Sequence, residues 1–254
     1  MLSFGKLVTN EWLKMFKKRS FFIPYAAIAV VIALVAFMMK QFGSAEGMPT
    51  GLEFTSAMFT KNGMGQLLTF LAIIGTAGSV PKEHSLGTIK LLLIRAQSRS
   101  KILAAKYVSV LVYILSLSLF AAGFSLLTGG LLFGLHAREL GWNDVFLSLL
   151  VQLAYSLIYV TVTFMIGVLT RSTGATIGVG MILVLIESLV VGLLSRYDII
   201  KYVLFTNVDL SVYLEGGTPP IQGMTLAFSL IVLAVYMVLF LGTSFVTFKK
   251  RDVA

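Results

Sequence analysis

Long apolar stretches alternate along the chain with short polar or charged connections, and this alternation predicts the architecture. Six stretches suit membrane helices, since about 20 residues rising ~1.5 Å each cross ~30 Å of hydrocarbon. The predicted spans are Phe21–Met39, Met64–Val80, Ile102–Leu135, Val145–Leu169, Ala175–Leu194 and Gly223–Phe248. We therefore expect an all-α membrane protein whose 254 residues form one transmembrane domain.

The segments outside a regular span length carry their own predictions. The second span is short and ends at Pro81, which disfavours helix in the preceding residue, so we expect little tilt or a kink. The third is long enough to tilt, to project beyond the bilayer or to break near Gly129-Gly130. Glycines and a proline in residues 40–63 predict a loop. Residues 195–222 are mixed, and we predict an external segment there.

The first twenty residues form an amphipathic pattern. On a helical wheel Phe4, Val8, Trp12, Met15 and Phe16 share an apolar face, opposite lysine and asparagine side chains. This predicts a helix lying at the membrane interface over residues 1–20. The alternative is a basic flank that only orients the first span.

Composition supports a chain solvated partly by lipid. Hydrophobic residues make up 57% of the chain and charged residues only 12%, with a mean hydropathy of +0.94. A soluble domain carries about 25% charged residues. The chain has no cysteine, which excludes disulfides, thiolate metal sites and a cysteine nucleophile.

The net charge of +9 is informative through its distribution. If the N-terminus is cytoplasmic and the spans alternate, fifteen Lys and Arg residues lie inside and five outside. This positive-inside bias predicts that both ends are cytoplasmic. The charge is thus expected to face anionic lipid, and nucleic-acid binding is not expected.

The residues offer little enzyme chemistry. His84 and His136 are predicted on opposite sides of the membrane, so they cannot share a metal ion. The chain has no phosphate loop of the Walker type and no nucleophile elbow. We expect no catalytic residue, no metal and no cofactor of its own.

A short apolar run lies in the charged connection 82–101. It is too short to span, and a cytoplasmic loop is not expected to expose it to water without a use. A short helix there could seat its leucines in a groove of a partner protein. An interfacial helix on lipid is the alternative, and the residues alone do not decide between them.

Two motifs resemble the permeases of ABC-2 type ABC transporters. The first is Glu83-x-x-x-Gly87-Thr88-Ile89-Lys90, followed by Ser98-Arg99-x-Lys101-Ile102-Leu103 and Lys106. The second is Asn10-Glu11-Trp12-Leu13-Lys14, before the first span. The span count, the amphipathic start and the basic tail extend the resemblance over nearly the whole chain.

The resemblance implies a permease subunit that works as a dimer, of identical or similar chains, with two copies of a separate ATPase. ATP would be bound by that partner. Connection 82–101 would be the coupling loop, with Glu83 fixing it to the base of the helices and 195–222 corresponding to an outer lid that can re-enter the membrane. The residues implied at the ATPase contact are Glu83, Gly87, Thr88, Lys90, Leu91, Leu92, Arg95 and Arg99.

Within that family the chain resembles compact bacterial permeases for bacitracin, lantibiotics and phenol-soluble modulins. This implies a bacterial cytoplasmic membrane and an amphipathic or antimicrobial peptide as cargo. Other members handle ions or lipid-linked molecules. A secondary transporter working without an ATPase is a further alternative, although such a protein is expected to show repeats.

Glu187 lies in the middle of the fifth span, where a charge costs about 3 kcal/mol on insertion scales. We predict either that it lines the translocation route and helps to recognise cationic cargo, or that it is bound structurally to a hydroxyl such as that of Ser116, Ser118, Thr161 or Thr163. Gly174 and Gly178 form a small-residue motif that predicts close helix packing, within the subunit or at a dimer seam.

Overall fold

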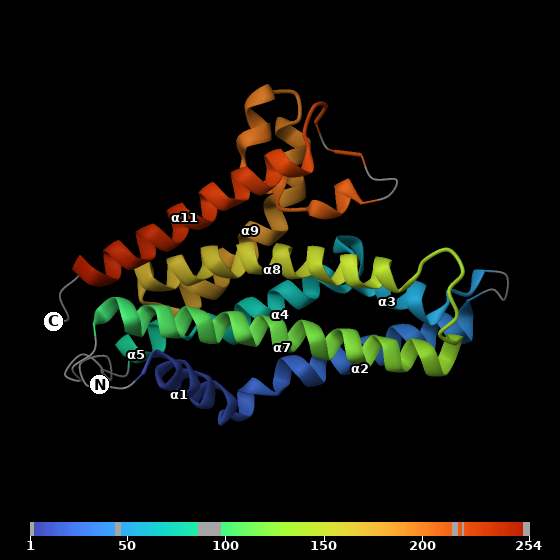
Figure 1. Ribbon diagram of the computed structural model, residues 1–254, viewed down its shortest axis with the longest axis horizontal. Coiled ribbons are helices and arrows are strands. Elements are labelled where there is room, and N and C mark those ends of the chain that lie inside the picture. Colours follow the sequence, from blue (N-terminus) through green and yellow to red (C-terminus); the bar gives the residue numbers. More distant parts are fainter. Residues whose placement is uncertain (1–2, 44–46, 86–97, 215–217, 220, 251–254) are drawn as a thin grey trace.

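The computed structural model describes residues 3–43, 47–85, 98–214, 218–219 and 221–250, and every regular element within these ranges is helical (Figure 1). Six helical stretches are long and apolar enough to cross a membrane: Arg19–Phe42, Gly63–Glu83, Arg99–Phe133, Trp142–Thr170, Thr173–Leu194 and Leu226–Lys250. The predicted all-α class and the six membrane-length helices are confirmed.

The elements follow one another in a simple order. They are α1 (Phe4–Phe16), η1 (Arg19–Phe21), α2 (Ile23–Phe42), α3 (Gly51–Phe59), η3 (Lys61–Gly65), α4 (Gln66–Thr76), α5 (Pro81–Ser85), α7 (Arg99–Phe133), α8 (Trp142–Thr170), α9 (Thr173–Leu194), η4 (Asp198–Tyr202), α10 (Leu204–Asn207), η5 (Leu210–Tyr213) and α11 (Leu226–Lys250).

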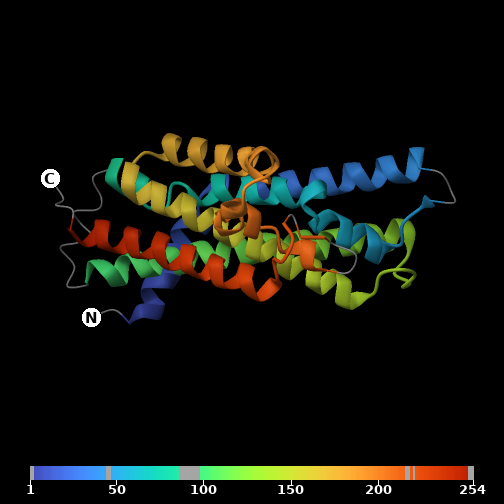
Figure 2. The same cartoon turned by 90° about the horizontal axis from the view of Figure 1, so that it is seen from above.

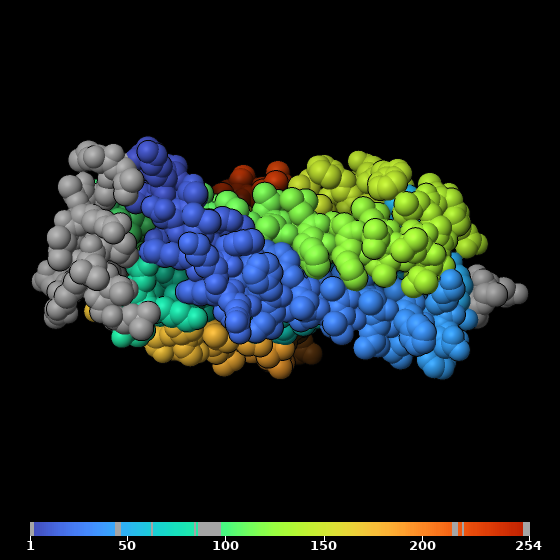
Figure 3. Space-filling view, turned by 90° about the horizontal axis from the view of Figure 1, so that it is seen from below, coloured from blue at the N-terminus to red at the C-terminus, as the bar shows by residue number. Residues whose placement is uncertain are grey.

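Helix α8 is the centre of the packing. It contacts α3, α4, α7, α9 and α11, whereas α1 and α2 pack on α7. Figure 1 shows these layers, with α1 and α2 below α7 and with α11 above α8. Figure 2 gives the view from above, and Figure 3 shows α1 and α2 covering one face of α7. The buried core therefore lies between α7 and α8 and the helices around them.

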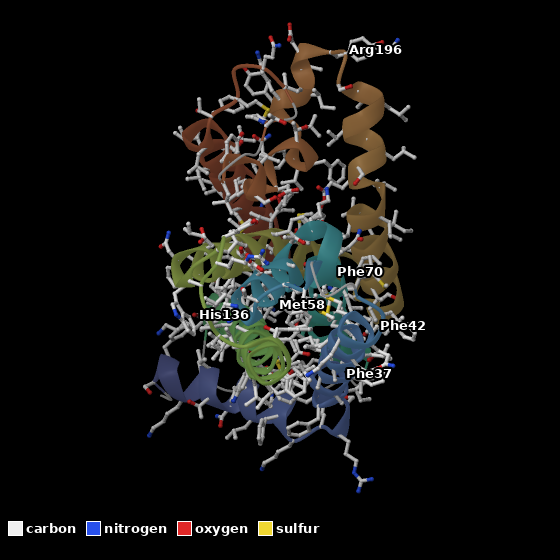
Figure 4. All side chains as sticks on the ribbon, turned by 90° about the vertical axis from the view of Figure 1, so that its right-hand side faces the viewer. Phe37, Phe42, Met58, Phe70, His136 and Arg196 are labelled. Carbon is white, nitrogen blue, oxygen red and sulfur yellow. The ribbon has the colours of Figure 1, made fainter. Side chains whose placement is uncertain are left out.

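The outer surface of the bundle is apolar. Phe37 and Phe42 on α2 point away from the other helices in Figure 4, and Phe42 is 78% exposed. Large aliphatic side chains such as Leu189 on α9 and Val238 on α11 are also exposed. A surface of this composition is the one that lipid-exposed helices present.

The predicted loop over residues 40–63 is wrong in its second half. Residues 51–59 form helix α3, which packs on α7 and α8 and buries seven of its nine residues. Its start is fixed by a capping box, in which Thr50 Oγ1 accepts from the Glu53 N–H at 3.2 Å and Glu53 accepts from the Thr50 N–H at 2.8 Å.

Helix α3 sits against the end of α7 by backbone contact. The Gly51 N–H donates to the carbonyl of Gly134 at 2.7 Å. A Cβ atom at Gly51 would lie 2.8 Å from the Gly129 carbonyl carbon and 2.9 Å from the Gly130 nitrogen. Gly129 and Gly130 therefore allow close approach, and the break considered there does not occur, since α7 is one helix from Arg99 to Phe133. Gly134, at φ 83°, ends it.

The second span is kinked. It starts in the π-helical η3, continues as α4 and includes the first residues of α5, which begins at Pro81. The segment after α9 contains the short helices η4, α10 and η5; α10 contacts α9 and α11, η5 contacts α8 and α11, and η4 contacts α10. Figure 4 places Arg196 at the tip of this part, away from α7.

We expect Gly51→Ala to lower the free energy of unfolding by about 2 kcal/mol, because the new methyl group meets backbone atoms that cannot move independently. Unfolding by SDS in mixed micelles measures the change. Gly123→Ala is the matched control, because a Cβ there meets no atom within 4 Å. Equal stability of the two variants would contradict the close contact between α3 and α7.

Candidate functional site

Two clusters of charged side chains lie between the helices. The first, which we call the base cluster, consists of Glu11, Lys14, Glu83 and Lys106. Lys106 Nζ lies 2.7 Å from Glu11 Oε2 and 2.7 Å from Glu83 Oε1. Lys14 Nζ lies 2.6 Å from Glu11 Oε1 and 3.1 Å from Glu83 Oε1. Two ammonium groups and two carboxylates thus alternate around one site.

The base cluster joins three elements that are far apart in the sequence. Glu11 and Lys14 lie three residues apart on α1, on one face of the helix. Glu83 lies on α5, and Lys106 lies on the second turn of α7 with only 1% of its side chain exposed. A buried ammonium group needs such partners, since removing it from water costs several kcal/mol. The cluster therefore fixes α1 and α5 to the start of α7.

The neighbouring charges in the base cluster shift the pKa values of Glu11 and Lys14. Burial on its own would raise the pKa of Glu11, but the ammonium groups of Lys106 and Lys14 outweigh burial and lower that pKa below its ordinary value. Burial likewise opposes the charge of Lys14, and hydrogen bonding and attraction to Glu11 and Glu83 raise its pKa. Both shifts favour the charged forms of Glu11 and Lys14 at neutral pH.

Of the residues predicted at the ATPase contact, the structure describes Glu83 and Arg99. Glu83 lies in the base cluster, and its role in fixing the coupling loop stays a prediction. Arg99 starts α7, and its Nη1 donates to the Lys249 carbonyl of α11 at 3.4 Å. The other predicted contact residues, Gly87, Thr88, Lys90, Leu91, Leu92 and Arg95, lie outside the described residues.

The second cluster, which we call the mid-bundle cluster, surrounds Glu187. Lys61 Nζ lies 2.5 Å from Glu187 Oε1. The hydroxyl groups of Tyr155 and Tyr159 both donate to Glu187 Oε2 at 2.7 Å. Glu187 is 1% exposed. A charged carboxylate at this depth is therefore compensated by one ammonium group and two hydroxyl groups.

Three elements build the mid-bundle cluster. Tyr155 and Tyr159 are four residues apart on α8, so they share a face, and their ring centroids lie 5.0 Å apart. Glu187 projects from α9, and Lys61 reaches it from η3. The hydroxyl partners considered from the sequence were wrong, because the tyrosines donate instead.

A second set of polar contacts holds η3 and α4 on α8. Gln152 Nε2 donates to the Gly65 carbonyl at 2.7 Å, to Ser156 Oγ at 3.1 Å and to Thr69 Oγ1 at 3.2 Å. Thr69 and Ser156 are also hydrogen-bonded to each other at 2.8 Å. These hydrogen bonds satisfy buried polar groups at the irregular start of the second span.

Gly174 and Gly178 do not pack against other parts of this chain. A Cβ atom at either would meet nothing within 4 Å, and both are exposed on α9. The predicted packing within the subunit is therefore wrong, and the dimer seam stays a prediction. Gly180 makes the close contact instead, since a Cβ there would lie 2.5 Å from Thr163 Oγ1 and 3.1 Å from Ile73 Cγ2.

Sequence reasoning singled out Glu187 and quoted the four residues of the base cluster in its motifs, but it did not pair them. It missed Lys61, Tyr155 and Tyr159. Tyr155 and Tyr159 carried a usable signal, because two tyrosines at helical spacing inside an apolar span predict a polar face. Nothing in the sequence paired Glu11 with Lys106, 95 residues away.

The two clusters pair acidic with basic side chains, and such pairs can fix helices or bind charged groups. Among the described residues, no three His, Asp or Glu side chains gather closely enough to hold a metal ion.

Comparison with known proteins gives a family and two relatives. A family model described as "Protein of unknown function (DUF2705)" matches residues 15–254. The uncharacterized protein YhcI of Bacillus subtilis (strain 168) is 28% identical over an alignment of 310 residues, which covers 98% of this chain and 99% of the relative. The uncharacterized membrane protein YdbK of the same organism is 25% identical over 247 residues, covering 95% and 99%. The second name agrees with a membrane protein.

We expect Lys106→Met to destabilise the folded chain by about 3 kcal/mol, because it leaves two partly buried carboxylates with Lys14 as their remaining partner in the base cluster. The free energy of unfolding in mixed micelles measures the loss. Lys101→Met, at an exposed position of the same helix, is the control and should change it by less than about 0.5 kcal/mol. Similar losses in both variants would contradict the role of the base cluster.

We also expect that lowering the pH weakens the docking of α1 on α5 and α7. Because Lys106 and Lys14 lower the folded pKa of Glu11, its ion pairs stabilise docking above its ordinary value of 4.5 and are lost as the pH falls through the lowered value. Fluorescence of Trp12, whose ring packs on Phe21, reports docking in a Trp142→Phe background. Adding Glu11→Gln should weaken docking at pH 7 and reduce the acid response. An unchanged acid response in that variant would contradict the prediction.

Proposed function

The chain belongs to the DUF2705 family, and we propose that it is the membrane-spanning permease subunit of an ATP-driven exporter. In this proposal a separate ATPase subunit, present in two copies, binds and hydrolyses ATP. The permease forms the translocation route as a dimer of identical or similar chains in the bacterial cytoplasmic membrane, with both ends in the cytoplasm.

The base cluster is the observation that carries this proposal. It ties the last described helix before residues 86–97, the amphipathic α1 and the start of α7 to one another through four charges. A force applied to the connection between α5 and α7 would therefore be transmitted to three elements at once. This is the mechanical property that a coupling loop on an ATPase requires.

Helix α1 fits a place at the membrane interface. None of its residues is fully buried in the chain, and the apolar Phe4, Leu13 and Phe16 are exposed. A helix of this kind can bury its apolar side chains at the headgroup boundary and keep its lysines in water. We propose that α1 lies there and that residues 86–97 include the coupling helix.

The cargo in this proposal is an amphipathic or antimicrobial peptide. Large exposed aliphatic side chains on α9 and α11 offer apolar surface, and the mid-bundle cluster offers charge. Glu187 would then line the route. An exporter for ions or lipids is the nearest variant of this proposal.

A second candidate is a secondary transporter that works without an ATPase. The ionised Lys61–Glu187 pair within the bundle favours it, because ion-coupled carriers use ionisable groups at membrane depth. The two candidates differ in whether ATP hydrolysis by a partner is needed.

Capture of the tagged full chain from its native membranes tests the proposal. We expect an ATPase subunit with a Walker motif to co-purify, and Leu91→Glu with Leu92→Glu to remove it, because charges at these positions would spoil an apolar contact. Ala137→Glu, in the exposed loop at the other end of α7, should keep the ATPase. Uptake or export by the purified chain alone, with no ATPase captured, would overturn the proposal in favour of the second candidate.

A further inference from the structure

We propose that the Glu187 carboxylate is a binding site for a primary ammonium group of the cargo, and that Lys61 fills this site when cargo is absent. The inference rests on the proposed function, because it names the chemical group by which that exporter would recognise its cargo. It predicts that Lys61 acts as a tethered competitor rather than as a permanent partner.

The two members of the ion pair differ in exposure. The Glu187 side chain is 1% exposed, whereas that of Lys61 is 23% exposed. The carboxylate is therefore reached along the side where the lysine enters. A group that displaced the Lys61 ammonium would find its counter-charge directly behind it.

Lys61 lies two residues before the second span, which begins at Gly63. It starts the π-helical η3, where Gly63 has the non-helical angles φ −89° and ψ −128°. The Thr60 hydroxyl accepts from the Gly63 N–H at 3.1 Å and supports this bend. The backbone at Gly63 therefore interrupts the regular helical geometry two residues after Lys61. A lysine on such a turn can leave its partner without unwinding a regular helix.

The carboxylate stays in place without Lys61. Its Oε2 accepts two hydroxyl groups, from Tyr155 and Tyr159, which are fixed on α8. Its Oε1 faces Lys61. Removing the lysine would therefore leave an oriented oxygen free to accept a charge-assisted hydrogen bond from another ammonium group.

The base cluster shows by contrast what a permanent ion pair in this chain looks like. Lys106 is 1% exposed, lies on regular helix α7 and contacts two carboxylates. Lys61 is more exposed, lies on an irregular turn and contacts one. From these differences we infer that Lys61 can leave its carboxylate in the mid-bundle cluster, whereas Lys106 holds its helices together permanently in the base cluster.

Replacement of the Lys61 ammonium by a cargo ammonium at Glu187 would also affect the proposed contact with the ATPase. Displacement of Lys61 frees η3 from α9, and η3 leads through α4 to α5, whose Glu83 belongs to the base cluster. Binding of cargo would thus alter the element that precedes the proposed coupling loop.

Rescue by a free amine tests the site directly. We expect Lys61→Ala to lower the thermal midpoint of the full chain in nanodiscs and 50 mM ethylammonium chloride to restore at least half of the loss. The double variant Lys61→Ala with Glu187→Gln should not respond, nor should Lys40→Ala, whose exposed ammonium contacts only a backbone carbonyl in the described structure. If Lys61→Ala is not recovered folded, ethylammonium present from extraction onward should restore its yield.

Binding of a synthetic peptide tests whether the Glu187 site recognises cargo. The probe is a synthetic amphipathic helix with a blocked N-terminus and one lysine. We expect Lys61→Ala to bind it about ten times more tightly than the native chain, because a site filled by its own ligand nine-tenths of the time loses that factor. Glu187→Gln should bind at least ten times more weakly, and acetylation of the lysine should abolish both differences.

Each of the two experiments has an outcome that would contradict the proposal. No rescue by ethylammonium, or equal rescue in the double variant, would overturn the ammonium site. Rescue with equal peptide affinity in all variants would overturn its assignment to cargo. Neither measurement uses the ATPase, so these failures are distinct from failure of the exporter proposal, which co-purification decides.

Discussion

A charged side chain buried away from water needs a compensating partner beside it, and this requirement determines how the helices of the chain are arranged. Each cluster draws its charges from elements that are distant in sequence: α1, α5 and α7 in one, and η3 and α9, joined by the α8 tyrosines, in the other. Apolar contacts carry no preference for a particular partner, whereas a buried charge requires a group of opposite charge or a hydrogen-bond donor or acceptor beside it. The clusters thus determine which elements meet and leave the outer apolar faces unconstrained.

The spans could be predicted from sequence because lipid imposes a simple rule of length and hydropathy. Predicted and observed ends of all six spans differ by at most three residues. Helix α3 was missed because its nine residues are too few for that rule and are preceded by glycines and a proline. Its capping box, Thr50 followed by Glu53, was the available signal, and the buried contact with α7 then completed the helix.

The candidate site was predictable only in part, for a related reason. Glu187 stood out because a carboxylate inside an apolar span is costly, and its burial agrees with that reasoning. Its partner could not be found the same way, because Lys61 lies where a loop was expected and reaches back into the bundle. Gly174 and Gly178 show the opposite error: a small-residue motif states that close approach is possible, but not which surface approaches. The partners of Glu83 required the folded arrangement of α1 and α7.

The unbroken length of α7 has a mechanical consequence. Its 35 residues form a rod of about 52 Å, at ~1.5 Å per residue. One end carries Lys106, and the other carries the glycines on which α3 rests. A stiff rod that pivots near its middle swings its two ends in opposite directions, and a rotation of only about 5° moves each end about 2 Å over that half-length. Without an interruption in α7, such a lever delivers a push at one surface as a displacement at the opposite surface, with no intervening joint to absorb it.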